Sequence, residues 1–258
     1  MRIQELINKK NREKISVLTA YNYVMASFAE EAGIDIILVG DSLANVELGR
    51  SSTASASMGD MIHHLRAVRC AVSRALIVVD MPYGSFHVSP DATVENARSL
   101  IDAGADAVKI EWHNDIIVHV AALKKEGIYV VGHVGLTPQT AQDFKVQGRD
   151  SARAEEIKQQ AEILENNGCF AVVLECVPQG LAQSITEGLS ILTIGIGAGK
   201  FCDGQVLVTY DMLGMYNRFH PKFVKQYALI GQSIVKAMTL YKEEVQQGLF
   251  PGPEHSFK

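Results

Sequence analysis

Ile34-Asp-Ile-Ile-Leu-Val-Gly-Asp41 is an apolar run that stops on a carboxylate. It follows residues 23–32, which have helical spacing, and Gly33, a residue that readily adopts the left-handed conformation that closes a helix. Parallel strands that are covered on both faces typically consist of such continuous Val, Ile and Leu runs. The stretch therefore predicts a helix followed by a buried parallel strand.

The same unit recurs along the whole chain. Strand-like runs alternate with segments of helical spacing, which favours a parallel sheet. Because no Gly-x-Gly-x-x-Gly motif follows the first run, a closed (β/α)8 barrel fits better than an open doubly wound sheet. The expected strands are residues 16–21, 34–41, 75–81, 107–111, 129–135, 171–176, 192–197 and 205–211. The expected helices are residues 23–32, 60–72, 94–103, 116–126, 152–167, 179–188 and 221–247.

The length of 258 residues suits a single barrel. We expect one (β/α)8 domain over residues 1–258, with a short N-terminal helix and a C-terminal helical extension. In residues 221–247 the apolar side chains lie roughly on one helical face, which we interpret as core rather than as a cofactor site, with an oligomer contact as an open alternative. The long connections 43–59 and 136–150 are expected to be lids or substrate loops.

Composition excludes several classes of function. A net charge of -5 gives no basic surface for nucleic acid, and no apolar run approaches the length of a membrane span. The four cysteines have no Cys-x-x-Cys spacing, and the start of the chain does not resemble a secretory signal. These features predict a cytoplasmic protein with free thiols and a small-molecule substrate.

Ionisable side chains stand at the ends of the predicted strands. Because the C-terminal ends of parallel barrel strands meet at one mouth, we expect these side chains to converge. They are Asp41, Asp80, Lys109, Glu111, His133 and Glu175.

Asp41 and Asp80 offer hard oxygen ligands from separate strands, the type that Mg²⁺ accepts. Either residue alone would equally serve as a helix N-cap, so only the pair indicates a metal. Lys109 and Glu111 are two residues apart and should face the same side of their strand. They form either an internal ion pair or a functional pair, in which Glu111 binds the metal directly or through water and Lys109 binds a substrate carboxylate.

His133 and Glu175 are candidates for proton transfer. His133 can titrate near neutrality or donate a hydrogen bond to an oxyanion, although a histidine at a strand end is often only a satisfied polar residue. Glu175 follows an almost wholly apolar strand, which suits a general base, but it could instead accept a hydrogen bond from a loop amide.

Several strings along nearly the whole chain resemble the ketopantoate hydroxymethyltransferase family. They are Leu18-Thr-Ala-Tyr, Val39-Gly-Asp-Ser, Asp80-Met-Pro, Val108-Lys-Ile-Glu, Gly132-His-Val-Gly-Leu-Thr-Pro-Gln, Lys145-Val-Gln-Gly-Arg, Leu174-Glu-Cys-Val-Pro, Thr193-Ile-Gly-Ile-Gly-Ala-Gly, Cys202-Asp-Gly-Gln-Val-Leu-Val and Glu254-His-Ser-Phe.

The resemblance implies a TIM barrel of the phosphoenolpyruvate/pyruvate-binding superfamily type. It also implies transfer of a one-carbon unit from 5,10-methylenetetrahydrofolate to 3-methyl-2-oxobutanoate, a Mg²⁺ cofactor and a homodecamer. By the same resemblance, Asp41, Asp80 and Glu111 form the metal site, and Asp41, Ser42, Asp80 and Lys109 contact the keto acid. Glu175 is then the proton acceptor, with His133 nearby.

The chain departs from the family at Arg50 and at Trp112-His113, where glycines are usual after Glu111. Two other functions remain open. One is a Mg²⁺-dependent 2-oxo-acid carbon-carbon lyase or mutase of the isocitrate lyase type, which typically has a reactive cysteine in a lid loop; loops 43–59 and 136–150 contain none. The other is a non-catalytic relative that binds keto acid and metal.

Overall fold

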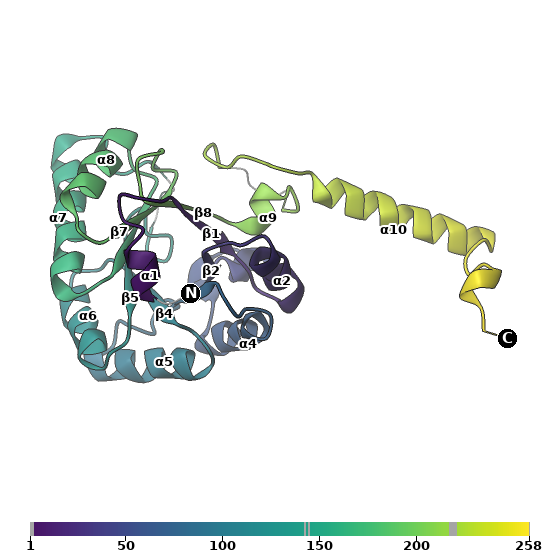
Figure 1. Ribbon diagram of the computed structural model, residues 1–258, viewed down its shortest axis with the longest axis horizontal. Helices are drawn as coiled ribbons and strands as arrows, with labels where there is room; N and C mark the ends of the chain where they lie inside the picture. Colours follow the sequence, from purple (N-terminus) through teal and green to yellow (C-terminus); the bar gives the residue numbers. More distant parts are fainter. Residues whose placement is uncertain (1–2, 142, 144, 217–220, 258) are drawn as a thin grey trace. The chain divides into compact units, whose positions relative to one another are not determined.

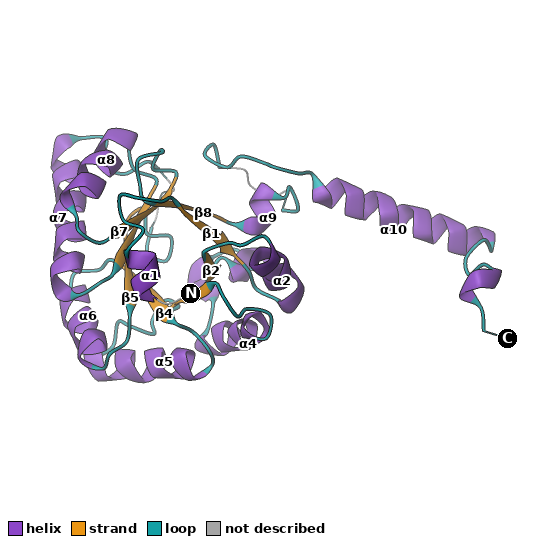
Figure 2. Ribbon diagram, viewed as in Figure 1, coloured by secondary structure: helices purple, strands orange, loops and turns teal. Residues whose placement is uncertain are grey.

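Eight parallel strands close into a barrel in the computed structural model, which describes residues 3–141, 143, 145–216 and 221–257. Each strand pairs with the next along the chain, and β8 pairs with β1 (Figure 2). The predicted (β/α)8 fold is confirmed. The strands are β1 (Ile15–Thr19), β2 (Ile36–Val39), β3 (Leu76–Asp80), β4 (Ala107–Glu111), β5 (Val130–Gly135), β6 (Ala171–Glu175), β7 (Leu192–Ile196) and β8 (Gly204–Leu207).

The helices between the strands surround the barrel (Figure 1). Their starts follow from local sequence: Asn22 accepts a hydrogen bond from the third residue of α2, Ser57 and Asp60 form a capping box on α4, and Ser89 precedes a proline in α5. The helices of residues 1–208 are α1 (Ile3–Ile7), α2 (Tyr23–Glu31), α3 (Leu43–Val46), α4 (Met58–Arg69), α5 (Pro90–Asp102), α6 (Ile116–Lys125), α7 (Ser151–Asn167) and α8 (Gln179–Gly188), with one 3-10 turn, η1 (Thr53–Ser55).

The barrel interior is filled by alternate residues of each strand. Val17, Leu38 and Val78 belong to one buried apolar cluster, as do Val131 and Val173. Ile3 and Leu6 of α1 join this cluster from outside the sheet, so α1 closes one end of the barrel. That end is made by the strand starts, because Ile15, Leu76 and Leu192 are members of the same cluster, and the opposite end remains for a site.

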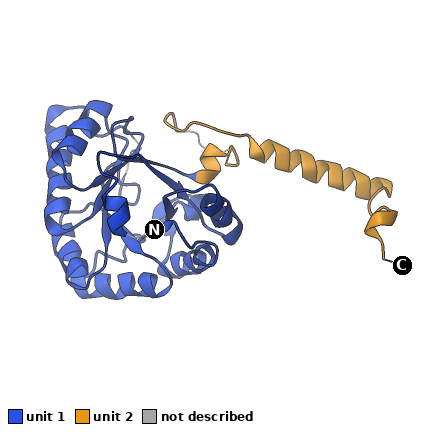
Figure 3. Ribbon diagram, viewed as in Figure 1, with its two compact units in different colours: residues 1–208 blue, residues 209–258 orange. Residues whose placement is uncertain are grey.

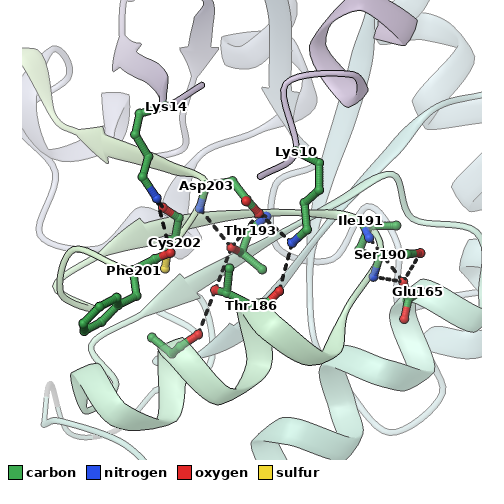
Figure 4. Close-up of polar contacts among 11 residues, drawn as sticks. Lys10, Lys14, Glu165, Thr186, Ser190, Ile191, Thr193, Phe201, Cys202 and Asp203 are labelled. Atoms are coloured by element: carbon green, nitrogen blue, oxygen red, sulfur yellow. Dashed lines mark hydrogen bonds and ion pairs between the residues drawn. The ribbon is translucent and has the colours of Figure 1, made fainter. Parts of the chain in front are cut away.

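Carboxylates join neighbouring strands at this closed end. In each of three places, an aspartate that precedes one strand accepts a backbone hydrogen bond from the strand beside it. The bonds are Ser16 N to Asp35 Oδ2 at 2.9 Å, Ile77 N to Asp106 Oδ2 at 2.8 Å and Thr193 N to Asp203 Oδ2 at 2.8 Å. Asp203 also receives Lys10 Nζ at 2.8 Å (Figure 4), so the charge of this buried carboxylate is balanced.

The chain divides into two compact units, residues 1–208 and residues 209–258 (Figure 3). The second unit contains α9 (Thr209–Met212), α10 (Ile230–Gln247) and the 3-10 turn η2 (Pro253–His255). The proposal of one domain over residues 1–258 stays a prediction. None of the described helices has both the length and the apolar composition that a membrane crossing requires.

Two predicted boundaries in the C-terminal part are wrong. The last strand ends at Leu207 rather than at residue 211, because α9 begins two residues later. The predicted helix 221–247 begins only at Ile230: Tyr227 N and Ile230 N bond to Met212 O and Leu213 O instead of to helical partners. No residue of α10 is buried, so its apolar side chains do not form the expected core within this chain.

Candidate active site

The sheet register brings the predicted ionisable residues together. Asp80 of β3 lies beside Lys109 of β4, and Glu111 of β4 lies beside His133 of β5. On β6, Glu175 pairs with Gly135, two residues beyond His133. Because side chains alternate along a strand, Lys109 and Glu111 face the same side, as the sequence predicts.

A single cavity of about 120 Å³ collects all of the predicted site residues. It lies among the C-terminal strand ends, away from the end that α1 closes. The predicted residues that line it are Asp41, Ser42, Asp80, Lys109, Glu111, His133 and Glu175. The rest of the lining is mostly apolar and comes from Thr19, Leu38, Thr53, Pro138, Val173, Ile196, Val206 and Val208. The convergence of the residues is observed; their chemical roles stay predictions.

Asp80 is the centre of the polar contacts on one side of the cavity. Lys109 Nζ lies 3.0 Å from Asp80 Oδ1, and the backbone N–H of Asp41 donates to Asp80 Oδ2 at 3.0 Å. Burial raises the pKa of Asp80 to about 6 against the opposing charge of Lys109, and the nearby Asp41 adds to the rise. Burial likewise raises the pKa of Asp41. Two buried carboxylates with raised pKa values show that the cavity has less positive charge than they need.

Lys109 is the cation among these acids. Burial alone would lower its pKa, but the charges of Asp80, Asp41 and Glu111 outweigh burial and raise the pKa above its ordinary value. Lys109 therefore stays protonated at neutral pH. A buried ammonium of this kind can neutralise a substrate carboxylate or the negative charge that develops on a keto oxygen.

His133 lies between two glutamates. Its Nδ1 is 3.4 Å from Glu111 Oε1, and its Nε2 is 3.1 Å from Glu175 Oε2. Burial and the charge of Lys109 lower the pKa of His133, but the contacts with Glu111 and Glu175 prevail and raise it to about 9. The two carboxylates favour the protonated form of the ring, which lies next to the Glu175 carboxylate.

The backbone around Glu175 is set by two left-handed residues. Gly135 has φ of 95°, and a Cβ there would collide with the backbone oxygen of Glu175. Cys176 adopts φ of 50°, which is uncommon outside glycine. The chain thus turns sharply after the candidate base, and such costly conformations cluster at functional sites.

Two residues of the site were given no role from the sequence. Gln139 Nε2 donates to Asp41 Oδ2 at 2.8 Å, and its backbone N–H donates to Glu111 Oε2 at 3.1 Å. The hydroxyl of the fully buried Tyr21 lies 2.8 Å from Ser42 Oγ. Both residues belong to sequence motifs that resemble the family. Their contacts depend on the conformation of the loops and could not be predicted from the sequence.

Two residues that depart from the family pattern, Arg50 and His113, make local contacts. Arg50 forms an ion pair with Asp60 at 2.8 Å and donates to Ser55 O at 2.6 Å, which fixes loop 43–59 to the start of α4. The ring of His113 packs against those of His87 and Phe86 at centroid distances of 4.7 and 5.6 Å. Arg50 and His113 are not among the residues that line the cavity.

The donor set fits a hard divalent cation. In the described part of the chain, no three His, Cys, Asp or Glu side chains form a metal-binding group, but Mg²⁺ commonly takes only one or two protein carboxylates and leaves its other positions to water and substrate. Asp41 and Asp80 supply such oxygens, and both carboxylates are buried in the cavity, where only Lys109 among the described side chains forms an ion pair with Asp80. Both oxygens of Glu111 are engaged by Gln139 and His133, which favours its water-mediated role over direct binding.

Fold and site together define a (β/α)8 barrel with a buried, acid-rich cavity suited to a small anionic substrate and a divalent ion. Residues 1–253 match the family described as Ketopantoate hydroxymethyltransferase, and the chain belongs to that family. A 3-methyl-2-oxobutanoate hydroxymethyltransferase of Syntrophus aciditrophicus is 53% identical over 96% of this chain and 93% of its own length. One of the same name from Moorella thermoacetica is 50% identical over 97% of this chain and 94% of its own.

Solved structures of similar fold are much more distant in sequence. A phosphonopyruvate hydrolase in complex with oxalate and Mg²⁺ superposes with a TM-score of 0.66 at 13% identity, covering 99% of this chain and 93% of that one. A 2,3-dimethylmalate lyase of the PEP mutase/isocitrate lyase superfamily gives 0.63 at 14% identity, covering 99% and 91%. At such identities the likeness shows a shared fold alone, that of the predicted (β/α)8 barrel.

Proposed function

We propose that this protein transfers a hydroxymethyl group from 5,10-methylenetetrahydrofolate to 3-methyl-2-oxobutanoate and so forms 2-dehydropantoate. Membership of the family and about 50% identity to relatives of that name support the reaction. The observation that carries it is the single cavity in which Asp41, Asp80, Lys109 and Glu175 meet. The product belongs to pantothenate biosynthesis.

Asp41 and Asp80 are the proposed metal ligands, with Glu111 acting through a water molecule. When bound, Mg²⁺ would polarise the 2-oxo group of the substrate. Ser42 and Lys109 contact the keto acid together with the two aspartates, and the ammonium of Lys109 balances the substrate carboxylate. This division leaves the opposite wall of the cavity to proton transfer.

Glu175 is the proposed base that removes the C3 proton of 3-methyl-2-oxobutanoate. His133 holds its carboxylate through the 3.1 Å contact and remains a donor on that side of the cavity. Water adds to the methylene carbon of the folate and its two bonds to the folate nitrogens break, which releases tetrahydrofolate and formaldehyde. The C3 carbanion then attacks the formaldehyde carbon, and the oxygen of formaldehyde takes up the proton held by Glu175 and becomes the new hydroxyl. The chain mainly contributes positioning and charge balance.

The lyase or mutase alternative has less support. Its members share the barrel at 10–14% identity, whereas the hydroxymethyltransferases share about half of all residues over almost the whole chain. A non-catalytic relative would not need a carboxylate positioned as Glu175 is. Incubation with 3-methyl-2-oxobutanoate, Mg²⁺ and methylenetetrahydrofolate should yield 2-dehydropantoate; binding of the keto acid without product would contradict the proposal.

The variant Glu175→Gln tests the base directly. Gln has nearly the same shape but cannot accept the C3 proton, so exchange of that proton with deuterated solvent should stop. Keto-acid binding measured by calorimetry should stay within a few-fold of the unmodified protein. Undiminished exchange, followed by NMR, would remove Glu175 as the base.

We also propose a cytoplasmic homodecamer. The four free cysteines suit a reducing compartment, and the exposed apolar side chains of α10, such as Met238 and Leu240, need cover in an assembly. Ten chains of 28.2 kDa give about 282 kDa, which sedimentation equilibrium would detect. Cell fractionation would test the compartment.

A further inference from the structure

Gln139 lies in the loop between β5 and α7, and both ends of that loop are tied to the end of β6. Leu136 N donates to Glu175 O at 2.9 Å, and Gln147 N donates to Cys176 O at 2.8 Å. Between these anchors, Gln139 reaches the other side of the cavity and is itself buried. Among its described residues, the loop is therefore held at its two ends and at Gln139.

The contacts of Gln139 fix the orientation of its amide. Nε2 donates to Asp41 Oδ2 at 2.8 Å and to Met81 O at 3.1 Å. Both partners are acceptors only, so the nitrogen and not the oxygen must face them. The backbone N–H of the same residue donates to Glu111 Oε2 at 3.1 Å.

We propose that Gln139 is a positioning residue that orients Asp41 and Glu111 for divalent-ion binding. The inference rests on the proposed function, because it takes Asp41 and Glu111 as part of the cation site. One residue thus constrains two acids that come from different strands and stand 98 and 28 positions away from it in the sequence. Without these bonds, each carboxylate would be free to rotate about its terminal torsion.

A second observation concerns the other amide atom. Gln139 Oε1 is buried, and no described residue donates a hydrogen bond to it. Buried polar atoms are rarely left unpaired, so this oxygen needs a donor that the protein does not supply. A water molecule of a hydrated cation could donate this hydrogen bond. The amide would then hold Asp41 through Nε2 and the hydrated cation through Oε1.

The test is Gln139→Met, which keeps the length of the side chain and the backbone N–H that Glu111 accepts, but removes the amide that holds Asp41. Binding of Mn²⁺ without substrate, measured by electron paramagnetic resonance, should weaken about 10- to 100-fold, the usual effect of losing a hydrogen-bond partner of a metal ligand. Gln147→Met is the matched control, because Gln147 lies in the same loop and its side chain donates to Lys145 O. The control should bind Mn²⁺ as the unmodified protein does.

Turnover separates positioning from a merely structural role. Product formation by Gln139→Met should fall at low Mn²⁺ and return to near the normal kcat at saturating Mn²⁺, since Glu175 and Lys109 are untouched. If Gln139→Met does not fold, Gln139→Asn keeps a polar but shorter side chain, and it too should bind Mn²⁺ more weakly. A folded variant with unchanged Mn²⁺ affinity, or lost turnover that saturating metal does not restore, overturns the inference alone. Absence of Mn²⁺ binding and of product in the unmodified protein would overturn the proposed function and this inference with it.

Discussion

At the scale of single residues, the cavity holds charges that depend on one another. Lys109 is buried within reach of three acids, and His133 is buried between two. Burying a charge is unfavourable unless a partner balances it, and removing one partner leaves the other uncompensated. The cavity should therefore respond more strongly to the loss of one charge than any pair on the surface.

Replacing Lys109 with Met should lower the free energy of unfolding by about 3–5 kcal/mol, the usual effect of breaking a buried ion pair. Met fills a similar volume, so the loss comes from Asp80 and Asp41, which are left as buried acids without their cation. Denaturant titration at neutral pH measures the change.

The matched control is Lys145→Met. Lys145 pairs with Asp143 at 2.7 Å, but both side chains are largely exposed, and such a pair contributes about 0–1 kcal/mol. Equal stability losses in the two variants would show that the charge balance within the cavity is unimportant for folding.

The ionisable residues were predictable because their positions follow from strand geometry. Lys109 and Glu111 share a face through simple alternation, and Asp80 and Glu175 end their strands. Gln139 was not predictable in this way: its contact with Asp41 depends on the path of a loop, for which the sequence has no periodic pattern. The same is true of Tyr21, which follows β1.

At the scale of elements, a glutamate near the end of a helix accepts backbone hydrogen bonds from the segment that precedes a later strand. Glu30, near the end of α2, accepts backbone hydrogen bonds from residues 73–75, just before β3. Glu165 of α7 accepts in the same way from Ser190 N at 2.7 Å and Ile191 N at 3.2 Å, just before β7 (Figure 4). Each acid thus joins one helix to a segment that is distant in the sequence.

The Glu30 interaction should make folding depend on pH in acid. Burial opposes ionisation, but the hydrogen bonds from Ala75, Ser73 and Arg74 prevail and lower the pKa of Glu30 to about 2 from its ordinary value of 4.5. A carboxylate with a lowered pKa stabilises the fold above the unfolded pKa, and this stability is lost as pH falls through the folded pKa. The window is therefore about pH 4.5 to 2.

The variant Glu30→Gln isolates this effect. It should melt at a lower temperature than the unmodified protein at pH 6, and the difference should shrink as pH falls toward 2, as followed by circular dichroism. Glu31→Gln is the control, because Glu31 is the neighbour of Glu30 on the same helix and is exposed. A difference that stays constant over this range would mean that the ionised state of Glu30 is not what holds residues 73–75.

Element boundaries were predictable where local signals are strong. Residues 107–111 and 179–188 were assigned to their full extent from apolar runs and helical spacing. Residues 221–229 misled the assignment because their apolar spacing is helical, while the backbone of Tyr227 and Ile230 bonds to residues 212–213. The spacing of apolar residues does not show that the backbone of this segment forms hydrogen bonds with another segment instead of within a helix.

At the scale of the barrel, the two ends differ in composition: one is closed by apolar side chains and paired charges, and the other contains the cavity with the ionisable residues. Apolar residues of α1 and balanced acids such as Asp203 close the end where strands begin. The end where strands finish instead contains two carboxylates, Asp41 and Asp80, whose pKa values are raised by burial. A divalent ion bound to both would relieve that penalty and stabilise the folded state.

Mg²⁺ or Mn²⁺ should therefore raise the melting temperature of the protein. An ion that binds only the folded state at 100 times its dissociation constant adds about 2.7 kcal/mol, which corresponds to several degrees for a chain of this size. Asp80→Asn removes a charged ligand from the same position and should lose most of the shift, while Asp143→Asn, at an exposed loop position, should keep it. Because the reference in each case is the same variant after chelation with EDTA, any intrinsic change in stability cancels. Equal shifts in Asp80→Asn and the unmodified protein would place the ion elsewhere. The negative charge of Asp41 and Asp80 would then be balanced by Lys109 alone.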